Sequence, residues 1–502
     1  MATATRSPRV VIVGAGMSGI AMGVALKRAG YDDFLILEKG EEVGGTWYWN
    51  HYPGLSCDVP SHLYQYSFHR KPDWRRVFAT GGEILDYHRE VVDRFGLRAH
   101  LRLATEVTSA RFSGDAWHIT TAAGDVHEAD FVVMATGILH HPNVPRIPGL
   151  DDFEGPVLHS ARWDVEAEFA GKRVAVIGTG STGVQLVSAM QPQAEQVTLF
   201  SRSPQWVLWG PTEMRQPAAL SSLMKRAPAL GGLLFDGLLK ASWLFTDIVT
   251  RPSWRRRLLQ ASARRHLGTI SDPELRRKLT PDYEPLCKRQ VVSGTFYRAV
   301  QQPNVEVVTE EIDHVRADGI VTTDARARQF DLIALATGFK AHSYMRPMEL
   351  IGRDGVTLDE AWRDGPRAYR MTAIPGFPNL FTILGPNSPV GSLPLHWCAE
   401  LSAGYIVQWL DRWTSREVEV VEPTEEATAR FNAQVAEALG PTVWNTGCNS
   451  WYQREDGTID LWPFDRATMR RMLGRPDPND FLIEAPAGSG AGGGAPAPAA
   501  QR

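Results

Sequence analysis

Cysteine is scarce in this chain, and neither acidic nor basic residues are in clear excess. The four cysteines, Cys57, Cys287, Cys398 and Cys448, are far apart and form no Cys-x-x-Cys pair, which argues against a zinc ribbon and against a dithiol–disulfide reductase. The 502 residues include 53 Lys and Arg against 57 Asp and Glu, so the basic excess of a nucleic-acid-coating protein is missing. We therefore expect a protein of a reducing compartment, the cytoplasm, with no nucleic acid among its partners.

Long uncharged apolar runs are also missing. Residues 1–9 carry no apolar stretch after their charges and do not resemble a secretory signal. The most apolar stretch, 229–249, is interrupted by Asp236, Lys240 and Asp247, whereas a membrane span needs ~20 mostly uncharged residues. We expect an amphipathic helix there and no membrane contact. The scattered histidines have no carboxylate at ligand spacing, so no metal site is expected, and the serine motif of a hydrolase is absent.

What is present is the composition of a globular enzyme. Hydrophobic residues are 43% and charged residues 22%, which excludes global disorder. At ~150 residues per domain, the length predicts about three domains. The segment 485–502 differs from the rest because it is mostly Ala, Gly and Pro, and we expect it to be disordered.

One pattern occurs twice along the chain. An apolar run at 9–13 leads into a Gly-x-Gly-x-x-Gly loop, a helical stretch to Ala29 and a strand at 34–37, and the same series runs from a strand at 173–177 to one at 197–200. The loop positions are Gly14, Gly16 and Gly19 in the first unit and Gly178, Gly180, Ser181, Thr182 and Gly183 in the second. In such βαβ units the first glycine permits a tight turn, the second lets a pyrophosphate approach the backbone, and the third lets helix and strand pack closely. The repeat predicts two dinucleotide-binding sites.

The residues that end the second strand of each unit distinguish the two nucleotides. Glu38 ends the first, where a carboxylate can accept both ribose hydroxyls of an adenosine, and this favours FAD or NAD. Arg202 lies at the matching place in the second unit, where a guanidinium would bind a 2′-phosphate that a carboxylate would repel. The second site is therefore predicted to take NADPH, with a solvated surface charge as the alternative for Arg202.

Two more features organise the chain. Apolar strands at 129–134 and 330–335 both end in Ala-Thr-Gly, whose small residues would let the chain cross closely between two nucleotide domains. Between 211 and 280 Leu, Ala, Arg and Trp recur at helical spacing, which predicts a helical insertion with solvated basic clusters. The expected fold is α/β, with two Rossmann-like dinucleotide-binding domains and this insertion in the second. We expect the first domain to be built from 1–150 and 339–484, and the second from 151–210 and 281–338.

Four further motifs carry a resemblance to a known family. They are Gly44-Gly45-Thr46-Trp47 with Tyr52-Pro53-Gly54 and Asp58; Phe153, Gly155, His159, Trp163 and Asp164; Cys287-Lys288-Arg289; and Asn449-Ser450-Trp451. With these motifs the chain, apart from its tail, resembles the class B flavoprotein monooxygenases and, within them, the type I Baeyer–Villiger monooxygenases. Flavin-containing N- and S-monooxygenases usually lack the Trp-Asp ending of the second motif, so its presence favours Baeyer–Villiger chemistry.

The resemblance implies FAD in the first nucleotide domain and NADPH in the second. It implies that Gly45, Thr46 and Trp47 lie near the flavin, although Trp47 itself is expected to be a packing residue. Trp451 is implied to contact the nicotinamide nucleotide. Lys288 is implied to reach the 2′-phosphate from the side opposite Arg202, unless it is simply an exposed lysine.

The same resemblance implies that Arg289 is the active-site arginine. Leu286 stands where the family more usually has a glycine before the cysteine. Asp58 would hold Arg289 in place and tune its field, with a turn-capping aspartate as the alternative. His159 is assigned to a hinge between the domains rather than to proton transfer.

The implied activity inserts one oxygen atom of O2 next to a ketone carbonyl. NADPH would reduce FAD, the reduced flavin would form a peroxide with O2, and the peroxide anion would convert the ketone to an ester or lactone. Because negative charge develops on the oxygens, a fixed cation is expected beside them, and Arg289 stays charged at any working pH. The runner-up is oxidation of soft N or S centres by a protonated peroxide, which does not need Arg289. A non-catalytic flavoprotein would not need the second nucleotide loop.

Overall fold

The computed structural model describes residues 6–388 and 391–486, so most of the tail expected to be disordered lies outside the described residues. Its first large sheet has the strand order β19-β7-β1-β2-β3, and the pairs are parallel. The strands are β1 (Val10–Val13), β2 (Phe34–Leu37), β3 (Leu101–Arg102), β7 (Phe131–Met134) and β19 (Leu380–Thr382). β1, β7 and β19 are short apolar runs buried on both faces, as a covered parallel sheet requires.

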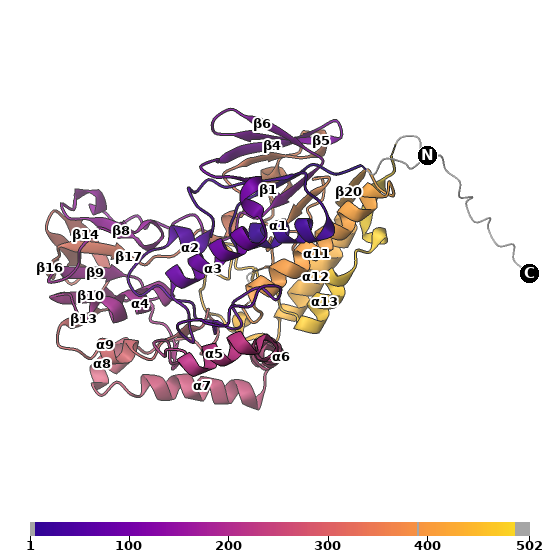
Figure 1. Ribbon diagram of the computed structural model, residues 1–502. Helices are drawn as coiled ribbons and strands as arrows, with labels where there is room; N and C mark the ends of the chain where they lie inside the picture. Colours follow the sequence, from indigo (N-terminus) through magenta and orange to yellow (C-terminus); the bar gives the residue numbers. More distant parts are fainter. Residues whose placement is uncertain (1–5, 389–390, 487–502) are drawn as a thin grey trace, which may run out of the picture.

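Helices from both ends of the chain cover this sheet. α1 (Met17–Ala29) follows the first glycine loop and packs against α11 (Leu395–Thr414), so nearly 400 residues of sequence separate neighbours in space. In Figure 1 α11, α12 (Glu425–Leu439) and α13 (Arg466–Gly474) lie together on the right of the molecule. The other helices of this part are α2 (Thr46–Trp49), α3 (Gly81–Arg94) and α10 (Leu358–Ala361).

The second large sheet has the order β13-β10-β9-β17-β8 and is also parallel. Its strands are β8 (Val157–His159), β9 (Arg173–Ile177), β10 (Gln196–Phe200), β13 (Val305–Val308) and β17 (Leu332–Leu335). α4 (Ser181–Met190) follows the second glycine loop, and α9 (Phe296–Ala299) packs against it. The two predicted βαβ units and the predicted α/β class are therefore confirmed.

Smaller sheets flank these two. β18 (Glu349–Ile351), β4 (Val107–Ser113), β5 (Ala116–Thr121) and β6 (Val126–Ala129) form one, seen at the top of Figure 1. β14 (Ile312–Arg316), β15 (Gly319–Thr322) and β16 (Ala327–Gln329) form another, and β20 (Val420–Pro423) pairs with β21 (Phe481–Glu484).

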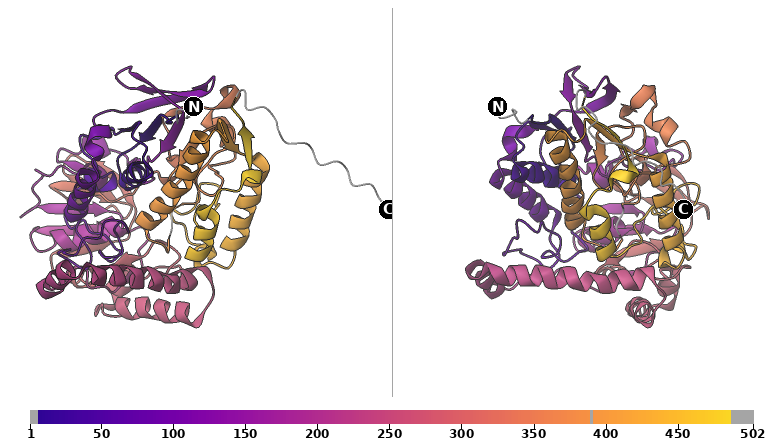
Figure 2. Two further views of the ribbon diagram at one scale, coloured as in Figure 1. Left: turned by 45° about the vertical axis from the view of Figure 1, so that its right-hand side comes forward. Right: turned by 90° about the vertical axis from the view of Figure 1, so that its right-hand side faces the viewer.

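The segment 211–280 is helical, as predicted. It contains α5 (Ala218–Arg226), α6 (Pro228–Thr250), α7 (Trp254–Leu267) and α8 (Pro273–Lys278), and α5, α6 and α7 form the base of the molecule in both views of Figure 2. β11 (Val207–Leu208) and β12 (Val291–Val292) pair at the two ends of this segment and return the chain to the second sheet. Within the described residues no helix is both long and apolar enough to cross a membrane.

The two Ala-Thr-Gly turns lie where the chain leaves each large sheet. A Cβ on Gly14 would come 2.6 Å from the carbonyl oxygen of Ala135, and a Cβ on Gly178 would overlap that of Ala336. Each turn therefore packs against the glycine loop of its own sheet. Beyond the turns the two crossing segments run side by side, with the Asn143 amide donating to the Gly338 carbonyl at 2.9 Å.

Candidate functional site

A cavity of 2720 Å³ lies between the two glycine loops. Pockets for one small molecule are typically ~300–1,000 Å³, so this cavity has room for more than one ligand. Both loops contribute to its wall, and so do Glu38, Asp58, Arg202, Lys288, Arg289 and Trp451. The fold thus brings most of the predicted site residues, from five distant stretches of sequence, to one cavity.

The first glycine loop is tightly packed at its three positions. Gly14 has φ +105°, which L side chains rarely adopt, and a Cβ on Gly19 would overlap the carbonyl oxygen of Gly14. Gly16 faces Gly45, where an added Cβ would come 2.8 Å from the Gly16 Cα atom. Gly19 does not line the cavity; it lets α1 pack closely on β1, as the third glycine of such loops does.

The Gly-Gly-Thr-Trp stretch closes over this loop. The Gly44 amide donates to the Ala15 carbonyl at 3.0 Å, and α2 begins immediately after Gly45. Trp47 is half-buried and its indole Nε1 donates to the Tyr64 hydroxyl at 3.2 Å. This motif therefore forms part of the cavity wall beside the first loop.

Glu38 is buried at the end of β2 and faces the cavity. Its carboxylate accepts from the backbone N–H of Ala15 at 2.7 Å and from that of Gly40 at 2.8 Å. Burial raises the pKa of Glu38, and the two backbone hydrogen bonds oppose that rise. Each oxygen keeps a second lone pair for the hydroxyls of a ribose.

The second glycine loop repeats the first but is open on one side. Gly178 has φ +114°, and a Cβ on Gly183 would overlap the carbonyl oxygen of Gly178. A Cβ on Gly180, in contrast, would meet nothing within 4 Å. Ser181 and Thr182 open α4 and line the cavity, where free backbone N–H groups favour an anion.

The Tyr-Pro-Gly stretch joins the two nucleotide units. The Tyr52 hydroxyl donates to the side-chain carbonyl of Gln185 on α4 at 2.8 Å, and the Gln185 amide donates to the Ser56 carbonyl at 2.9 Å. Gly54 lies so close to α4 that an added Cβ would come 2.8 Å from the Gln185 carbonyl oxygen. This motif therefore fixes the second unit against the first.

Two cations converge beside the second loop. Arg202 is exposed at the cavity mouth, and Lys288 donates through Nζ to the Ser203 hydroxyl at 3.1 Å. Burial and the nearby charge of Arg202 lower the pKa of Lys288. Two cations that repel each other in this way can attract a doubly charged anion such as a phosphate.

Asp58 and Arg289, which are 231 positions apart in sequence, form an ion pair with Nη2 donating to Oδ1 at 3.0 Å. The Asp58 side chain is 13% exposed and that of Arg289 37% exposed, so the guanidinium keeps a free edge toward the cavity. The Asp58 charge raises the pKa of Arg289 further above its ordinary value. The Arg289 guanidinium is thus permanently charged, and its orientation is fixed by Asp58.

Sequence reasoning missed two tyrosines beside this pair. Tyr452 is buried next to Arg289, and burial raises its pKa to about 12. Tyr64 is partly buried where it interacts with the charges of Asp58 and Arg289, and this burial raises its pKa as well. Trp451, on the cavity wall, has its ring 4.7 Å from that of Tyr452. The position of Tyr452 directly after the predicted Trp451 was the available signal.

His159 lies at the end of β8, where its Nδ1 accepts from the Ala161 amide at 3.1 Å. Burial lowers its pKa, so the ring is neutral, and its ring centroid is 6.2 Å from that of Phe339 on a crossing segment. The hinge assignment of His159 stays a prediction. In the described part of the chain no group of three or more His, Cys, Asp and Glu side chains gathers as metal ligands.

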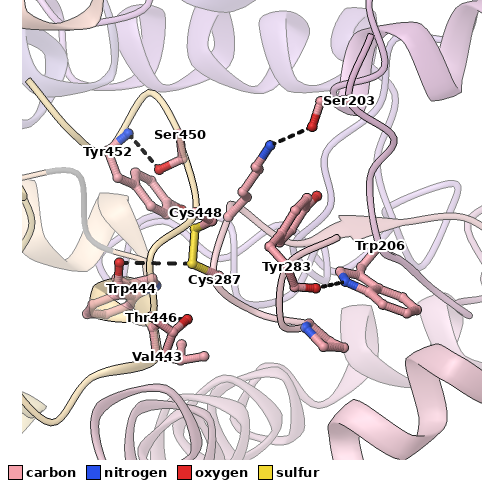
Figure 3. The surroundings of a disulfide bond; sticks show 12 residues. Ser203, Trp206, Tyr283, Cys287, Val443, Trp444, Thr446, Cys448, Ser450 and Tyr452 are labelled. Carbon is pink, nitrogen blue, oxygen red and sulfur yellow. Dashed lines mark hydrogen bonds between the residues drawn. A yellow bond between two sulfur atoms is a disulfide. The ribbon is translucent and has the colours of Figure 1, made fainter. Parts of the chain in front are cut away.

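The cysteines differ from the expectation of separate thiols in a reducing compartment. Cys287 and Cys448 form a disulfide, whereas Cys57 and Cys398 are free and buried. Spacing along the chain could not indicate this pair, because 161 residues separate its two members. Figure 3 shows that the disulfide lies among Tyr283, Trp444 and Tyr452, and residues that follow each cysteine, Lys288 and Asn449, line the cavity.

Comparisons with known proteins agree with this geometry. A family described as pyridine nucleotide-disulphide oxidoreductase matches residues 11–220. An uncharacterized monooxygenase of Mycobacterium tuberculosis is 49% identical over 95% of this chain and 96% of its own length, and a Baeyer–Villiger monooxygenase of Streptomyces coelicolor is 39% identical over 95% and 93%. A crystal structure of cyclohexanone monooxygenase from Rhodococcus sp. Phi1 bound to NADP⁺ is 30% identical and covers 96% of this chain and 100% of its own, with a TM-score of 0.86.

Proposed function

The chain belongs to the type I Baeyer–Villiger monooxygenases, and we propose that the Asp58–Arg289 pair is the electrostatic centre of its reaction. It is an FAD- and NADPH-dependent flavoprotein monooxygenase that inserts one oxygen atom of O2 next to a ketone carbonyl. The observation that carries the proposed role is a permanently charged guanidinium with a free edge on the cavity between the two nucleotide loops.

The residues of the first unit fit FAD. The glycine loop is tightly packed where a pyrophosphate would approach, and Glu38 keeps acceptor capacity for ribose hydroxyls. We propose that Gly14, Gly16, Gly19, Glu38, Gly45, Thr46, Trp47 and Asp58 form its binding site. When bound, FAD supplies the redox chemistry, taking a hydride from NADPH and activating O2.

The residues of the second unit fit NADPH. The open side of Gly180 and the N-terminus of α4 suit its pyrophosphate, and the two cations at the cavity mouth suit its 2′-phosphate. We propose that Gly178, Gly180, Ser181, Thr182, Gly183, Arg202, Lys288 and Trp451 bind this nucleotide. The domain bounds inferred from the sequence, 1–150 with 339–484, 151–210 with 281–338, and 211–280, remain our proposed division, and the cytoplasm is the proposed location.

The roles of the pair follow from charge. As oxygen is transferred, negative charge develops on the reacting oxygen atoms, and Arg289 stabilises that charge without reorganising, because Asp58 already fixes its direction. Tyr452 interacts with the charge of Arg289 and stays protonated at neutral pH, because burial raises its pKa to about 12. Apolar side chains on the wall, Leu63, Phe245 and Leu393, would exclude water from the reacting groups.

Product analysis tests the proposal. The purified enzyme is incubated with NADPH, air and a panel of ketones, with one sulfide included, and the products are identified. We expect esters or lactones from the ketones. The alternative, oxidation of soft N or S centres, does not need a fixed cation; a sulfoxide without any ester from the panel would favour it and overturn the role of Arg289.

A further inference from the structure

The disulfide between Cys287 and Cys448 joins two stretches that line the cavity. Their Cα atoms are 6.1 Å apart, and both side chains are buried, Cys287 completely and Cys448 to within 3%. Lys288 and Arg289 follow Cys287 directly, and the stretch that ends in Trp451 and Tyr452 follows Cys448. The cross-link therefore connects the cation loop, residues 283–289, to the tryptophan loop, residues 448–452.

Hydrogen bonds hold the cation loop to the second nucleotide unit. The Tyr283 hydroxyl donates to the Pro204 carbonyl at 3.0 Å, and the Trp206 indole donates to the Tyr283 carbonyl at 2.7 Å. Lys288 lies 4.2 Å from the centre of the Tyr283 ring. On this side the loop is thus held by several noncovalent contacts, and on the opposite side by the one covalent bond to Cys448 (Figure 3).

The turn before Cys287 is strained. Leu286 has φ +80°, a left-handed conformation that glycine adopts freely and leucine does not. This is the position where the sequence departs from the usual glycine of the family. The strain persists because the Leu286 side chain is 2% exposed in the core and the next residue is cross-linked.

We propose that Cys287 and Cys448 form a reversible redox cross-link that positions Arg289 against the tryptophan loop, and that hydrogen peroxide from the enzyme's own uncoupled turnover forms it. The inference rests on the proposed function, since hydrogen peroxide is released when activated oxygen reaches water instead of a ketone. The bond then acts as feedback. Hydrogen peroxide released without ketone oxygenation forms the disulfide, and the disulfide holds the site in the geometry in which oxygen is transferred to the ketone.

The chemistry balances without another reactant. A thiolate attacks one oxygen of hydrogen peroxide, which forms a sulfenic acid and releases hydroxide; the second thiol then attacks the sulfenic sulfur, forms the S–S bond and releases water. Two thiols lose two electrons and hydrogen peroxide becomes two waters. The thiolate is the attacking form of the cysteine in the first step. Cys57 and Cys398 are the internal contrast, because neither is cross-linked.

The state of the cysteines is measured first. The purified holoenzyme is reduced with a phosphine, freed of reductant and exposed to hydrogen peroxide, and its thiols are alkylated under denaturing conditions and located by mass spectrometry. We expect four alkylated cysteines before oxidation and two after it, Cys57 and Cys398, with a linked peptide pair from 287 and 448. Random loss of all four thiols, or no linked pair, would overturn the proposal.

Nucleotide binding separates a positioning role from a merely structural one. If the cross-link orders the cation and tryptophan loops, NADP⁺ should bind the oxidised enzyme about fivefold or more tightly than the reduced enzyme. By reciprocity, NADP⁺ should shift the thiol–disulfide equilibrium in a glutathione buffer toward the disulfide by the same factor. Equal affinities and an unmoved equilibrium would show that the bond does not position the loops.

Matched variants complete the test. Cys287→Ser and Cys448→Ser should both fix the enzyme in the reduced behaviour, with weaker NADP⁺ binding and more hydrogen peroxide per NADPH consumed. Cys398→Ala should keep the full redox response. Thiol mapping and NADP⁺ titration need no ketone turnover, so the two proposals can fail separately. If the enzyme makes no ester but its NADP⁺ affinity still depends on the disulfide, only the proposed function is contradicted. If it makes ester but reduction of the disulfide changes neither NADP⁺ affinity nor hydrogen peroxide release, only the cross-link proposal is contradicted.

Discussion

The two glycine-loop units have the same βαβ structure, but the residues that follow their second strands carry opposite charges. β1, α1 and β2 repeat in β9, α4 and β10, and in both loops the first glycine packs under an Ala-Thr-Gly turn. Glu38 is buried and bonded to two backbone amides of its own unit, whereas Arg202 is exposed and forms no ion pair with any described residue. Gly16 is covered by Gly45, while Gly180 faces open space.

The difference indicates how each nucleotide is used. A binding loop closed by a neighbouring loop, with its polar groups already arranged, suits a cofactor that stays bound through many turnovers. An open loop with unpaired cations suits a nucleotide that must enter and leave in each cycle. We therefore expect the first site to keep its cofactor and the second site to exchange its nucleotide.

The largest effect is expected when a glycine of each loop is replaced by alanine, which adds one methyl group. Gly19→Ala would force a Cβ into the carbonyl oxygen of Gly14, so we expect protein that folds poorly or lacks FAD. Gly183→Ala would cause the same overlap with Gly178 but should leave the yellow flavin in place and abolish reduction by NADPH. The measurements are flavin absorbance per protein and the rate of flavin reduction.

Gly82→Ala is the matched control for both changes, because a Cβ there meets nothing within 4 Å and the residue is outside the cavity wall. It should keep both the flavin and its reduction. Equal flavin loss in Gly19→Ala and Gly183→Ala would mean that the two units do not have separate ligands.

The next effect concerns the ion pair that bridges the units. Arg289→Ala should lower the rate of ketone oxygenation about 10²–10³-fold while FAD stays bound, because a preorganised charge is lost from the reacting oxygens. Asp58→Ala should lower the same rate. The rate of the double variant should be only slightly lower than that of Arg289→Ala, because both changes remove the same electrostatic stabilisation. Sulfide oxidation should lose less in each variant. Rates for both substrates in all three variants decide this, and additive ketone losses would show that the two residues act independently.

A smaller effect tests the exposed cation of the second unit. Arg202→Ala should raise the KM for NADPH by about tenfold to a hundredfold, the range for a lost charge-assisted hydrogen bond, and should leave the KM for NADH nearly unchanged. Steady-state kinetics with both nucleotides provide the measurement. Equal changes in the KM values for NADPH and NADH would show that Arg202 does not bind the 2′-phosphate.

The parts of this fold that could be predicted from the sequence depend on local patterns. The glycine spacing, the apolar strands and the charged residue that ends each second strand lie within about 30 residues of one another. For the same reason the helical character of 211–280 could be predicted from its composition. Two βαβ units and their different nucleotides can therefore be inferred from short stretches of the chain.

The parts that could not be predicted depend on contacts between distant residues. The pairing of Asp58 with Arg289 followed only from the family resemblance, Tyr64 and Tyr452 were missed, and nothing in the spacing indicated the disulfide. One local signal did exist. A leucine at a usual glycine position indicates a backbone held in an unfavourable conformation, and Leu286 has that conformation.

The smallest effect comes from Lys288 and appears as a pH dependence. Its pKa is already lowered by burial and by Arg202, and a bound 2′-phosphate needs the protonated amine. As the pH rises toward the lowered pKa, the free enzyme loses the proton that binding must restore, so affinity for NADP⁺ should fall. Affinity for NAD⁺, which lacks the phosphate, should stay level over the same range.

Lys288→Arg separates this titration from a general loss of structure at high pH. A guanidinium stays charged throughout, so the variant should bind NADP⁺ with little pH dependence above neutrality. Measurements start above about pH 7.5 because a phosphate monoester loses its second proton at about pH 6 and would otherwise add its own slope. If the wild type and Lys288→Arg have the same slope, Lys288 does not face the phosphate, and Arg202 alone distinguishes the second unit from the first.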